Sequence, residues 1–315
     1  MTESQDLPIG SPTPVSYSSI VQEHDPGQTQ REARKKLLQE IGGKAFNDDS
    51  EPNGVIVHIA DASLSSSDIP VLGNVLLQIG DVKTLNLVLQ SPGGDGTVVE
   101  KFVSLCRLQC KKFRVIIPNE AKSAATLIAL GADEIVMGPA SEMGPIDAQV
   151  DIVANGIRRL ISAQSFIDAR DRLLKRYNEQ LANQEDVGAT LQMLATLDLP
   201  FITECERLME FGRDVARKLL KAYMFKEKEN RGALIERVVK ELTSVELFKV
   251  HGRGIDGRTA RDRLKLNISL RGKNDEFWQK VWEYYTRATV TTGIGGVVKM
   301  FETEHELLAA KRSTP

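Results

Sequence analysis

Short runs of consecutive aliphatic residues, separated by segments with helical periodicity, dominate the chain between residues 54 and 137. Runs such as VIVHIA and LNLVL lack the alternation of polar and apolar residues that one-sided strands show, so they predict strands buried on both faces. Helices between such strands cover both faces of a parallel sheet. The expected strands are 55–60, 85–89, 113–117 and 134–137, and the expected helices are 66–79, 95–110 and 123–130. We therefore predict an α/β fold with a parallel-sheet core.

Composition divides the chain into four regions. Residues 1–28 are rich in Ser, Pro, Gln and Gly and bury too little apolar surface to fold, so we expect a disordered tail. Residues 29–53 contain a short basic helix and a polar linker. Residues 54–155 are the expected α/β catalytic core. Residues 156–315 are the expected helical extension, which completes the fold and forms an oligomer interface. An aromatic stripe at 277–285 in this extension is typical of a core or a subunit interface.

Charge balance and missing motifs exclude several classes of function. The 41 basic and 43 acidic residues nearly cancel, which argues against nucleic acid or an anionic membrane surface as a partner. No apolar run approaches the roughly 18 residues that a membrane span needs, and the N-terminus lacks a signal-peptide pattern. Three cysteines fit a reducing compartment. We therefore expect a cytoplasmic protein with no metal, no cofactor and no phosphate-binding loop.

Two unusual loops follow neighbouring strands, at the edge of the sheet where α/β proteins bind ligands. Gln90–Gly96 contains Gly93 and Gly94, whose missing side chains let a backbone N–H approach a substrate carbonyl. Pro118–Ala125 places the hydroxyl of Ser123 at the start of the next helix. Alone, the first is usually a simple turn and the second a helix N-cap. Together they predict a nucleophile beside an oxyanion-binding loop, with the two segments within about 10 Å of each other.

Three segments carry a resemblance to a known family. Residues 87–95, LVLQSPGGD, and residues 121–138, AKSAATLIALGADEIVMG, resemble the serine dehydrogenase proteinase family. Residues 143–149, MGPIDAQ, are similar to the stretch that follows the nucleophile helix in that family. The family is related to signal peptide peptidase A and, more distantly, to the proteolytic subunit of Clp protease. The resemblance covers roughly Gly54 to Ile268. It implies a Clp/crotonase-like core of ββα-type units and an ATP-independent serine peptidase that acts on peptides or proteins and forms homo-oligomers.

The resemblance also implies roles for individual residues. Ser123 is the nucleophile, the backbone N–H groups of Gly94 and Ala124 form the oxyanion hole, and Gly93 contacts the substrate. Two positions depart from the family pattern, because alanine occupies positions 125 and 148 where relatives commonly have Gly and Pro. Both residues are small, so these differences bear on substrate fit more than on activity.

The general base that activates Ser123 is less evident. A Clp-like triad needs a histidine soon after the nucleophile helix, and none occurs between Ser123 and His251. Signal peptide peptidase A uses a lysine further along the chain, and by that resemblance Lys175 is the first candidate, with a solvated helix face as the alternative interpretation. A lysine base needs burial, which lowers the pKa of an ammonium group. His251 is the second candidate, because imidazole titrates near neutrality, although its surroundings resemble a structural turn.

Two other functions stay open. One is a non-proteolytic acyl-transfer enzyme or hydrolase of the same superfamily, since an oxyanion hole is shared and a fold does not decide function. The serine in the second loop argues against a hydratase, which needs carboxylates at that place. The other is a catalytically silent scaffold, which the missing base leaves open.

Overall fold

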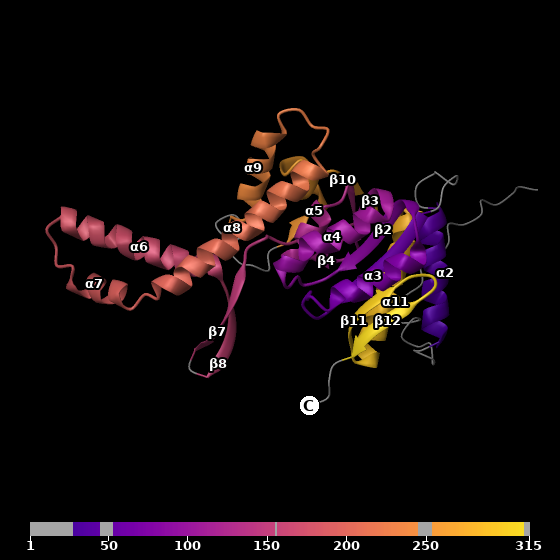
Figure 1. The fold of residues 1–315 in the computed structure, drawn as a ribbon, viewed down its shortest axis with the longest axis horizontal. Helices are drawn as coiled ribbons and strands as arrows, with labels where there is room; N and C mark the ends of the chain where they lie inside the picture. Colours follow the sequence, from indigo (N-terminus) through magenta and orange to yellow (C-terminus); the bar gives the residue numbers. More distant parts are fainter. Residues whose placement is uncertain (1–27, 45–52, 155, 245–253, 312–315) are drawn as a thin grey trace, which may run out of the picture.

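The computed structural model describes residues 28–44, 53–154, 156–244 and 254–311. A seven-stranded sheet with the order β10-β5-β3-β2-β1-β11-β12 forms its centre (Figure 1). The parallel strands are β1 (Asn53–Ala60), β2 (Val82–Gln90), β3 (Cys110–Ile117), β5 (Glu134–Met137) and β10 (Ile268–Leu270). The antiparallel strands at one edge are β11 (Val297–Glu302) and β12 (Leu307–Lys311). The predicted α/β class with a parallel-sheet core is confirmed.

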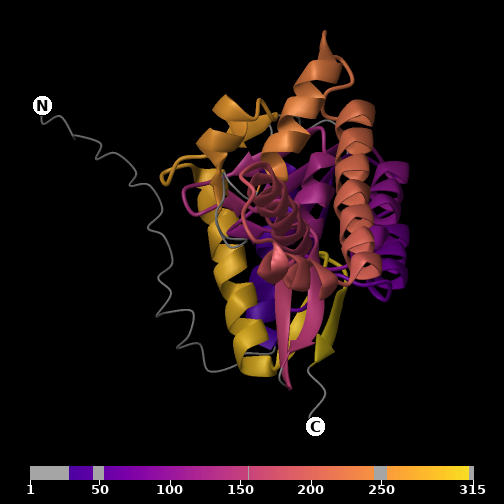
Figure 2. The same cartoon turned by 90° about the vertical axis from the view of Figure 1, so that its left-hand side faces the viewer.

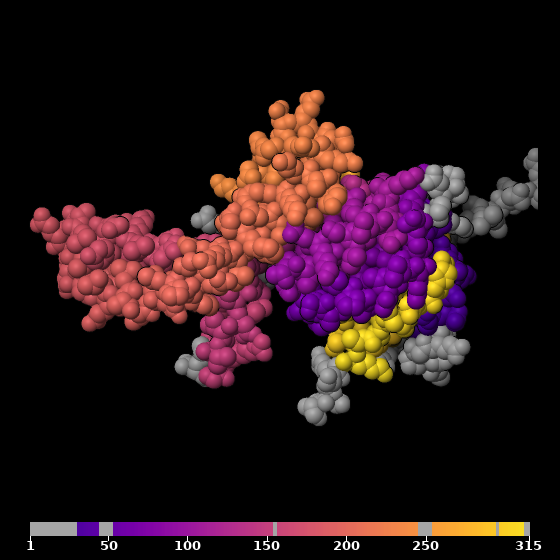
Figure 3. Space-filling view, in the orientation of Figure 1, coloured from indigo at the N-terminus to yellow at the C-terminus, as the bar shows by residue number. Residues whose placement is uncertain are grey.

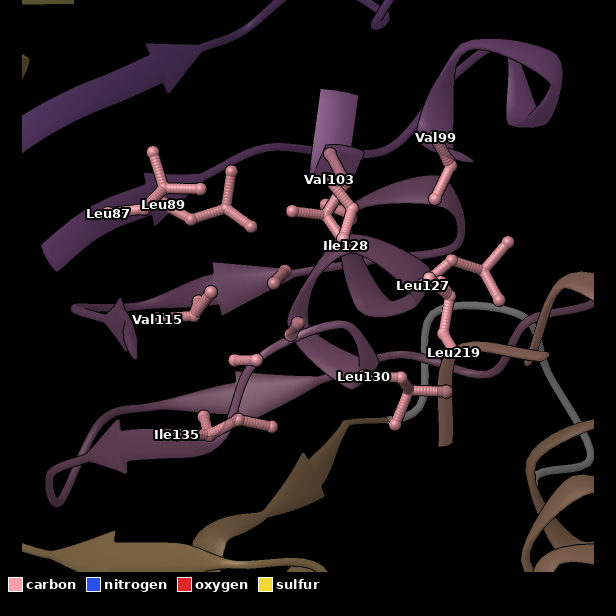
Figure 4. Close-up of a cluster of buried hydrophobic side chains, with 14 of the residues drawn as sticks. Leu87, Leu89, Val99, Val103, Val115, Leu127, Ile128, Leu130, Ile135 and Leu219 are labelled. Atoms are coloured by element: carbon pink, nitrogen blue, oxygen red, sulfur yellow. The ribbon is translucent and has the colours of Figure 1, made fainter. Parts of the chain in front are cut away.

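Helices cover both faces of this sheet. On one face α2 (Gln28–Lys44) and α11 (Glu276–Gly295) pack on alternate strand residues such as Val57 and Val88. On the other face lie α3 (Asp68–Ile79), α4 (Val99–Leu108) and α5 (Ala124–Leu130). Figure 4 shows Val103 of α4 beside Ile128 of α5, with Leu219 of α8 beside Leu130. Burial on both faces explains why the strands consist of consecutive aliphatic residues.

The C-terminal half of the chain contributes strands to the sheets as well as helices. It contains α6 (Ala163–Ala182), α7 (Gly188–Ala195), α8 (Leu199–Ala222) and α9 (Arg231–Leu242). It also supplies β10, β11 and β12 to the main sheet and β9 (Ile255–Asp256) to a small sheet with β4 (Glu120–Ala121) and β6 (Glu142–Met143). Most of the predicted tail, residues 1–27, and part of the linker, residues 45–52, lie outside the described residues.

One part of the chain projects from the body, and we call residues 149–209 the arm. The arm consists of the hairpin β7 (Gln149–Ala154) and β8 (Ile157–Ser162), then α6, α7 and the first part of α8. It extends well beyond the sheet (Figures 1 and 3) and points toward the viewer in Figure 2. A small apolar cluster at its root includes Val150, Cys205 and Met209. Large apolar side chains are exposed along the arm, namely Val153, Ile157, Leu160, Leu174, Leu181, Leu191, Met193 and Leu199. Large exposed apolar side chains are therefore concentrated in this part of the chain.

Candidate active site

The two loops that the sequence singled out lie in direct contact. The backbone N–H of Ser91 donates to the carbonyl of Glu120 at 3.1 Å, and the N–H of Lys122 donates to the carbonyl of Ser91 at 3.1 Å. These two hydrogen bonds hold Gly93 next to Ser123. A Cβ added to Gly93 would lie 2.8 Å from the Ser123 Cβ. Gly93 also has a φ of +101°, which side chains disfavour. Both observations explain why glycine occupies this position.

Ser123 has an unusual backbone conformation at the start of α5. Its φ of 49° and ψ of −115° place it in a region that residues with a side chain rarely occupy. The hydroxyl makes no capping hydrogen bond to the helix, although the residue occupies the N-cap position. The common reason for a serine at a helix start is therefore absent. Strain of this kind is retained where the surrounding structure enforces it, as it often does at functional sites.

The surroundings of Ser123 hold this conformation. The carbonyl of Ser123 accepts from the N–H of Leu127 at 3.1 Å, and the carbonyl of Lys122 accepts from the N–H of Ala125 at 2.9 Å. The whole of α5 is buried and packs into the main core. The side chain of Ser123 is only half-buried. A rigid helix therefore presents a partly open hydroxyl at its N-terminus.

The backbone N–H groups of Gly94 and Ala124 belong to the two segments that meet at Ser123. Leu64 donates its N–H to the carbonyl of Gly93 at 2.7 Å and accepts from the N–H of Asp95 at 2.9 Å. In this parallel bridge the N–H of Gly94 points away from Leu64, because consecutive peptide groups face opposite sides. Ala124 is the first residue of α5, so its N–H has no acceptor within the helix. The N–H groups of Gly94 and Ala124 are therefore the candidate donors of an oxyanion hole.

Gly94→Ala tests how tightly this loop is built. The added Cβ would lie 2.3 Å from the backbone nitrogen of Leu64, at a φ of +140°. We expect the free energy of unfolding to fall by at least about 2 kcal/mol, since neither backbone can yield easily. Chemical denaturation measures this change.

Gly73→Ala in α3 is the matched control for Gly94→Ala. A Cβ at Gly73 meets nothing within 4 Å. Alanine in a helix is favoured over glycine by about 0.5–1 kcal/mol, so this variant should be slightly more stable than the wild type. Equal stabilities for the two variants would contradict the close approach of Gly94 to Leu64.

Residues 70–178 match the family model of the ClpP-like SDH-type serine proteinase. This match includes both loops and Lys175, and it confirms the resemblance that the sequence motifs indicated. It points to a ClpP-like fold and to a hydrolase of the serine-protease type.

Two curated relatives from Methanocaldococcus jannaschii match a shorter part of the chain. Uncharacterized protein MJ1495 is 39% identical over 66 residues, which are 21% of this chain and 23% of that protein. Uncharacterized protein MJ0137 is 35% identical over 68 residues, which are 22% of this chain and 24% of that protein. The chain thus spans less than a quarter of the length of either relative.

Solved structures of low identity are also similar to the chain. A serine-to-alanine mutant of the 1510-N membrane-bound stomatin-specific protease is 15% identical, with 70% of this chain and 95% of that chain covered and a TM-score of 0.28. A lysine-to-alanine mutant of the 1510-N protease, in complex with a substrate peptide, is 18% identical, with coverages of 74% and 98% and a TM-score of 0.28. An enoyl-CoA hydratase from Mycobacterium avium subsp. paratuberculosis is 14% identical, with coverages of 58% and 93% and a TM-score of 0.22.

Lys122 directly precedes Ser123, and its side chain pairs with Glu142. Its side chain is buried, and its Nζ donates to Oε1 of Glu142 in β6. Its Cδ lies so close to Gly144 that a Cβ there would approach it to 2.6 Å. The ion pair therefore ties the loop that carries Ser123 to the small sheet β4-β6-β9, and this role is structural.

The structure does not bring the predicted lysine base to Ser123 within one chain. Lys175 lies on α6 in the arm, with 77% of its side chain exposed and its Nζ 3.7 Å from Oε1 of Glu179. Its helix projects away from the body of the protein, whereas α5 lies within it (Figure 1). An exposed lysine lacks the desolvation that a lysine base requires.

The histidines add no second base among the described residues. His58 is fully buried in β1 and stacks on Phe301 with ring centroids 4.4 Å apart, and burial lowers its pKa to about 4. His305 is exposed beside Glu304. His251 and His24 lie outside the described residues, so the candidate base His251 stays a prediction.

Two further properties concern metals and membranes. Within the described ranges no group of three or more His, Cys, Asp or Glu side chains has the arrangement of a metal site. Among the helices of the same ranges, none is both long enough and apolar enough to cross a membrane.

Proposed function

We propose that the protein is a serine peptidase that hydrolyses peptide bonds through an acyl-enzyme on Ser123. The observation that carries this proposal is the uncapped, strained Ser123 held against the Gly93–Gly94 loop. A serine that merely capped α5 would gain nothing from this conformation. A nucleophile gains a partly open hydroxyl near the candidate N–H donors of Gly94 and Ala124, which is the arrangement that acyl transfer requires.

The reaction follows from this geometry. Oγ of Ser123 attacks the carbonyl carbon of the scissile peptide bond and gives its proton to a base, while the carbonyl oxygen becomes an oxyanion. The N–H groups of Gly94 and Ala124 donate hydrogen bonds to that oxyanion. Collapse of the intermediate breaks the C–N bond, the amine leaves with a proton from the base, and an ester remains on Ser123. Water then hydrolyses the ester by the reverse set of proton transfers.

The base in this proposal is Lys175, supplied by the arm of a second copy of the chain. Within one chain Lys175 is exposed and distant from Ser123, so it needs another surface to desolvate it. The exposed apolar residues of the arm need burial as well. A homo-oligomeric contact of the arm meets both needs, and it completes a site that is incomplete in one chain. His251 is the alternative base.

The proposal includes the setting of the enzyme. The substrate is a peptide or a protein, and no cofactor takes part in the reaction. The sequence has no phosphate-binding loop, so the peptidase acts without ATP of its own. Three free thiols, of Cys106, Cys110 and Cys205, favour the reducing cytoplasm as its compartment.

A fluorophosphonate probe tests the proposed function directly. The probe phosphonylates only activated serines, so we expect labelling of the wild-type chain at Ser123, located by peptide mass spectrometry, and none of Ser123→Ala. Ser141 is the internal control, because its hydroxyl is buried, donates to the carbonyl of Ile117 and accepts from the N–H of Gly138. A folded wild-type chain that stays unlabelled would favour a silent scaffold over an enzyme.

A further inference from the structure

A buried ion pair outside the proposed site lies behind the oxyanion loop. Lys299 in β11 places its Nζ 2.8 Å from both carboxylate oxygens of Asp68, the first residue of α3. The two side chains are 11% and 4% exposed. Placing two charges in a protein interior is costly, and hydrophobic residues of similar size are often at least as stabilising. Stability alone therefore does not account for this pair.

The pair holds one short segment of the chain, residues 61–67, which we call the Leu64 segment. Nζ of Lys299 also donates to the carbonyl of Ser63 at 2.8 Å, and Oδ2 of Asp68 accepts from the N–H of Ser65 at 2.8 Å. The backbone on both sides of Leu64 is thus bound to the ion pair. A third bond joins the N–H of Asp61 to a carbonyl of β11, that of Val298, at 2.9 Å.

Leu64 itself is bound to the oxyanion loop. It exchanges two backbone hydrogen bonds with Gly93 and Asp95, and it occupies the space where a Cβ of Gly94 would be. The direction of the Gly94 N–H therefore depends on where Leu64 lies. Leu64 in turn depends on an ion pair whose members are 231 residues apart.

The neighbouring histidine does not disturb this arrangement at neutral pH. His58 lies close enough for Asp68 and Lys299 to affect its titration, but burial is the larger influence and lowers its pKa to about 4. No third charge from His58 then competes with the pair.

We infer that the Lys299–Asp68 ion pair is a positioning device for the oxyanion loop and acts through the Leu64 segment. Lys299 and Asp68 are positioning residues, because they touch Leu64's neighbours rather than the substrate. The C-terminal strand β11 thereby controls the geometry of a site built from residues 91–124. This inference rests on the proposed function for its catalytic consequence, but its structural part stands without it.

The test uses Lys299→Met/Asp68→Asn in the full chain. Changing both residues leaves no unpaired buried charge, and the introduced carboxamide still accepts from the N–H of Ser65. Hydrogen exchange should become at least about tenfold faster in peptides covering 61–67 and 91–96, because the Leu64 segment loses the bond from Lys299 to the carbonyl of Ser63 and the ion pair that fixes residue 68. On a fluorogenic peptide kcat should fall about 10- to 100-fold with KM within about threefold, since a misplaced donor weakens only the transition state.

Arg34→Met is the matched control. Arg34 is a buried cation that pairs with Glu302 on the same strand β11, at 2.7 Å, and donates to the hydroxyl of Thr291 in α11. Glu302 keeps Arg31 and the hydroxyl of Tyr284 as partners. This variant should melt at a lower temperature and leave exchange at 91–96 and kcat unchanged.

The outcomes separate this inference from the proposed function. Unchanged exchange at 91–96 in the double variant overturns the inference, and so does faster exchange with an unchanged kcat. If Arg34→Met produces the same effects, the pair is only a structural support and the inference also fails. A wild-type chain without peptidase activity refutes the proposed function, and the exchange data alone then decide whether the ion pair positions the loop.

Discussion

Ser123→Ala and Ser123→Gly are both expected to lower peptidase turnover by at least about 10³-fold, because each removes the nucleophile. The two variants should differ in stability. Ser123 has a φ of 49°, which alanine tolerates no better than serine and glycine adopts readily. The glycine variant should therefore be the more stable by about 1 kcal/mol, the low end of the usual cost of such strain. Turnover of a fluorogenic peptide and urea denaturation measure the two effects.

Two results would contradict the role proposed for Ser123. Turnover near the wild-type level in either variant would remove Ser123 from the mechanism. Equal stability of the alanine and glycine variants would mean that Ser123 carries no backbone strain, and the main structural argument for its role would be lost. Gly73→Ala, a site with open space around it, shows how the same assays respond to a glycine–alanine exchange that strain does not influence.

The strands of the core were predictable because their signal is local. Consecutive aliphatic residues in 85–89 and 113–117 need burial on both faces, and the structure extends these strands only to Val82–Gln90 and Cys110–Ile117. The contact between the two loops was predictable for a related reason. Loops that follow adjacent parallel strands emerge at the same edge of a sheet.

Strands β11 and β12 could not be predicted from the local sequence pattern. Lys299 interrupts the apolar run Val297–Phe301, Glu302 ends the strand, and a central lysine argues against a buried strand. It is buried here because Asp68 neutralises it, and Asp68 lies 231 residues away in sequence. Hydrophobic periodicity, which is read over short windows, does not reveal an ion-pair partner so far away in the sequence. The φ of Ser123 is hidden in the same way, since only the packed environment enforces it.

The position of Lys175 shows a limit of another kind. The sequence places it at a suitable separation from Ser123, but separation along a chain does not determine distance in space. The arm carries Lys175 away from the sheet and leaves apolar residues exposed beside it. Whether Lys175 reaches Ser123 therefore depends on the contact between two copies of the chain. The sequence of one chain does not specify the geometry of that contact.

Lys175→Arg should reduce turnover at least about 100-fold if Lys175 is the base, because guanidinium keeps its proton at neutral pH. The folded state should be unaffected, since Lys175 is exposed and only its pair with Glu179 is altered. Arg176→Lys is the matched control: it is a charge-conserving change at the neighbouring exposed position and should keep full activity. Initial rates on one fluorogenic peptide should be measured for the wild type, Lys175→Arg and Arg176→Lys.

Mixing two inactive variants identifies the chain that supplies the base. When Ser123→Ala and Lys175→Arg are combined in equal amounts and allowed to exchange subunits, some sites receive an intact Ser123 from one copy and an intact Lys175 from the other. Random pairing should restore about a quarter of the wild-type activity per chain if the arm reaches across to a second copy. A mixture that stays inactive after proven subunit exchange would contradict a base supplied by a second copy. Ser123 and Lys175 would then act within one chain, or neither would take part in the mechanism. If Lys175→Arg keeps its activity and His251→Ala loses it, His251 is the base, and the arm serves only to join the subunits.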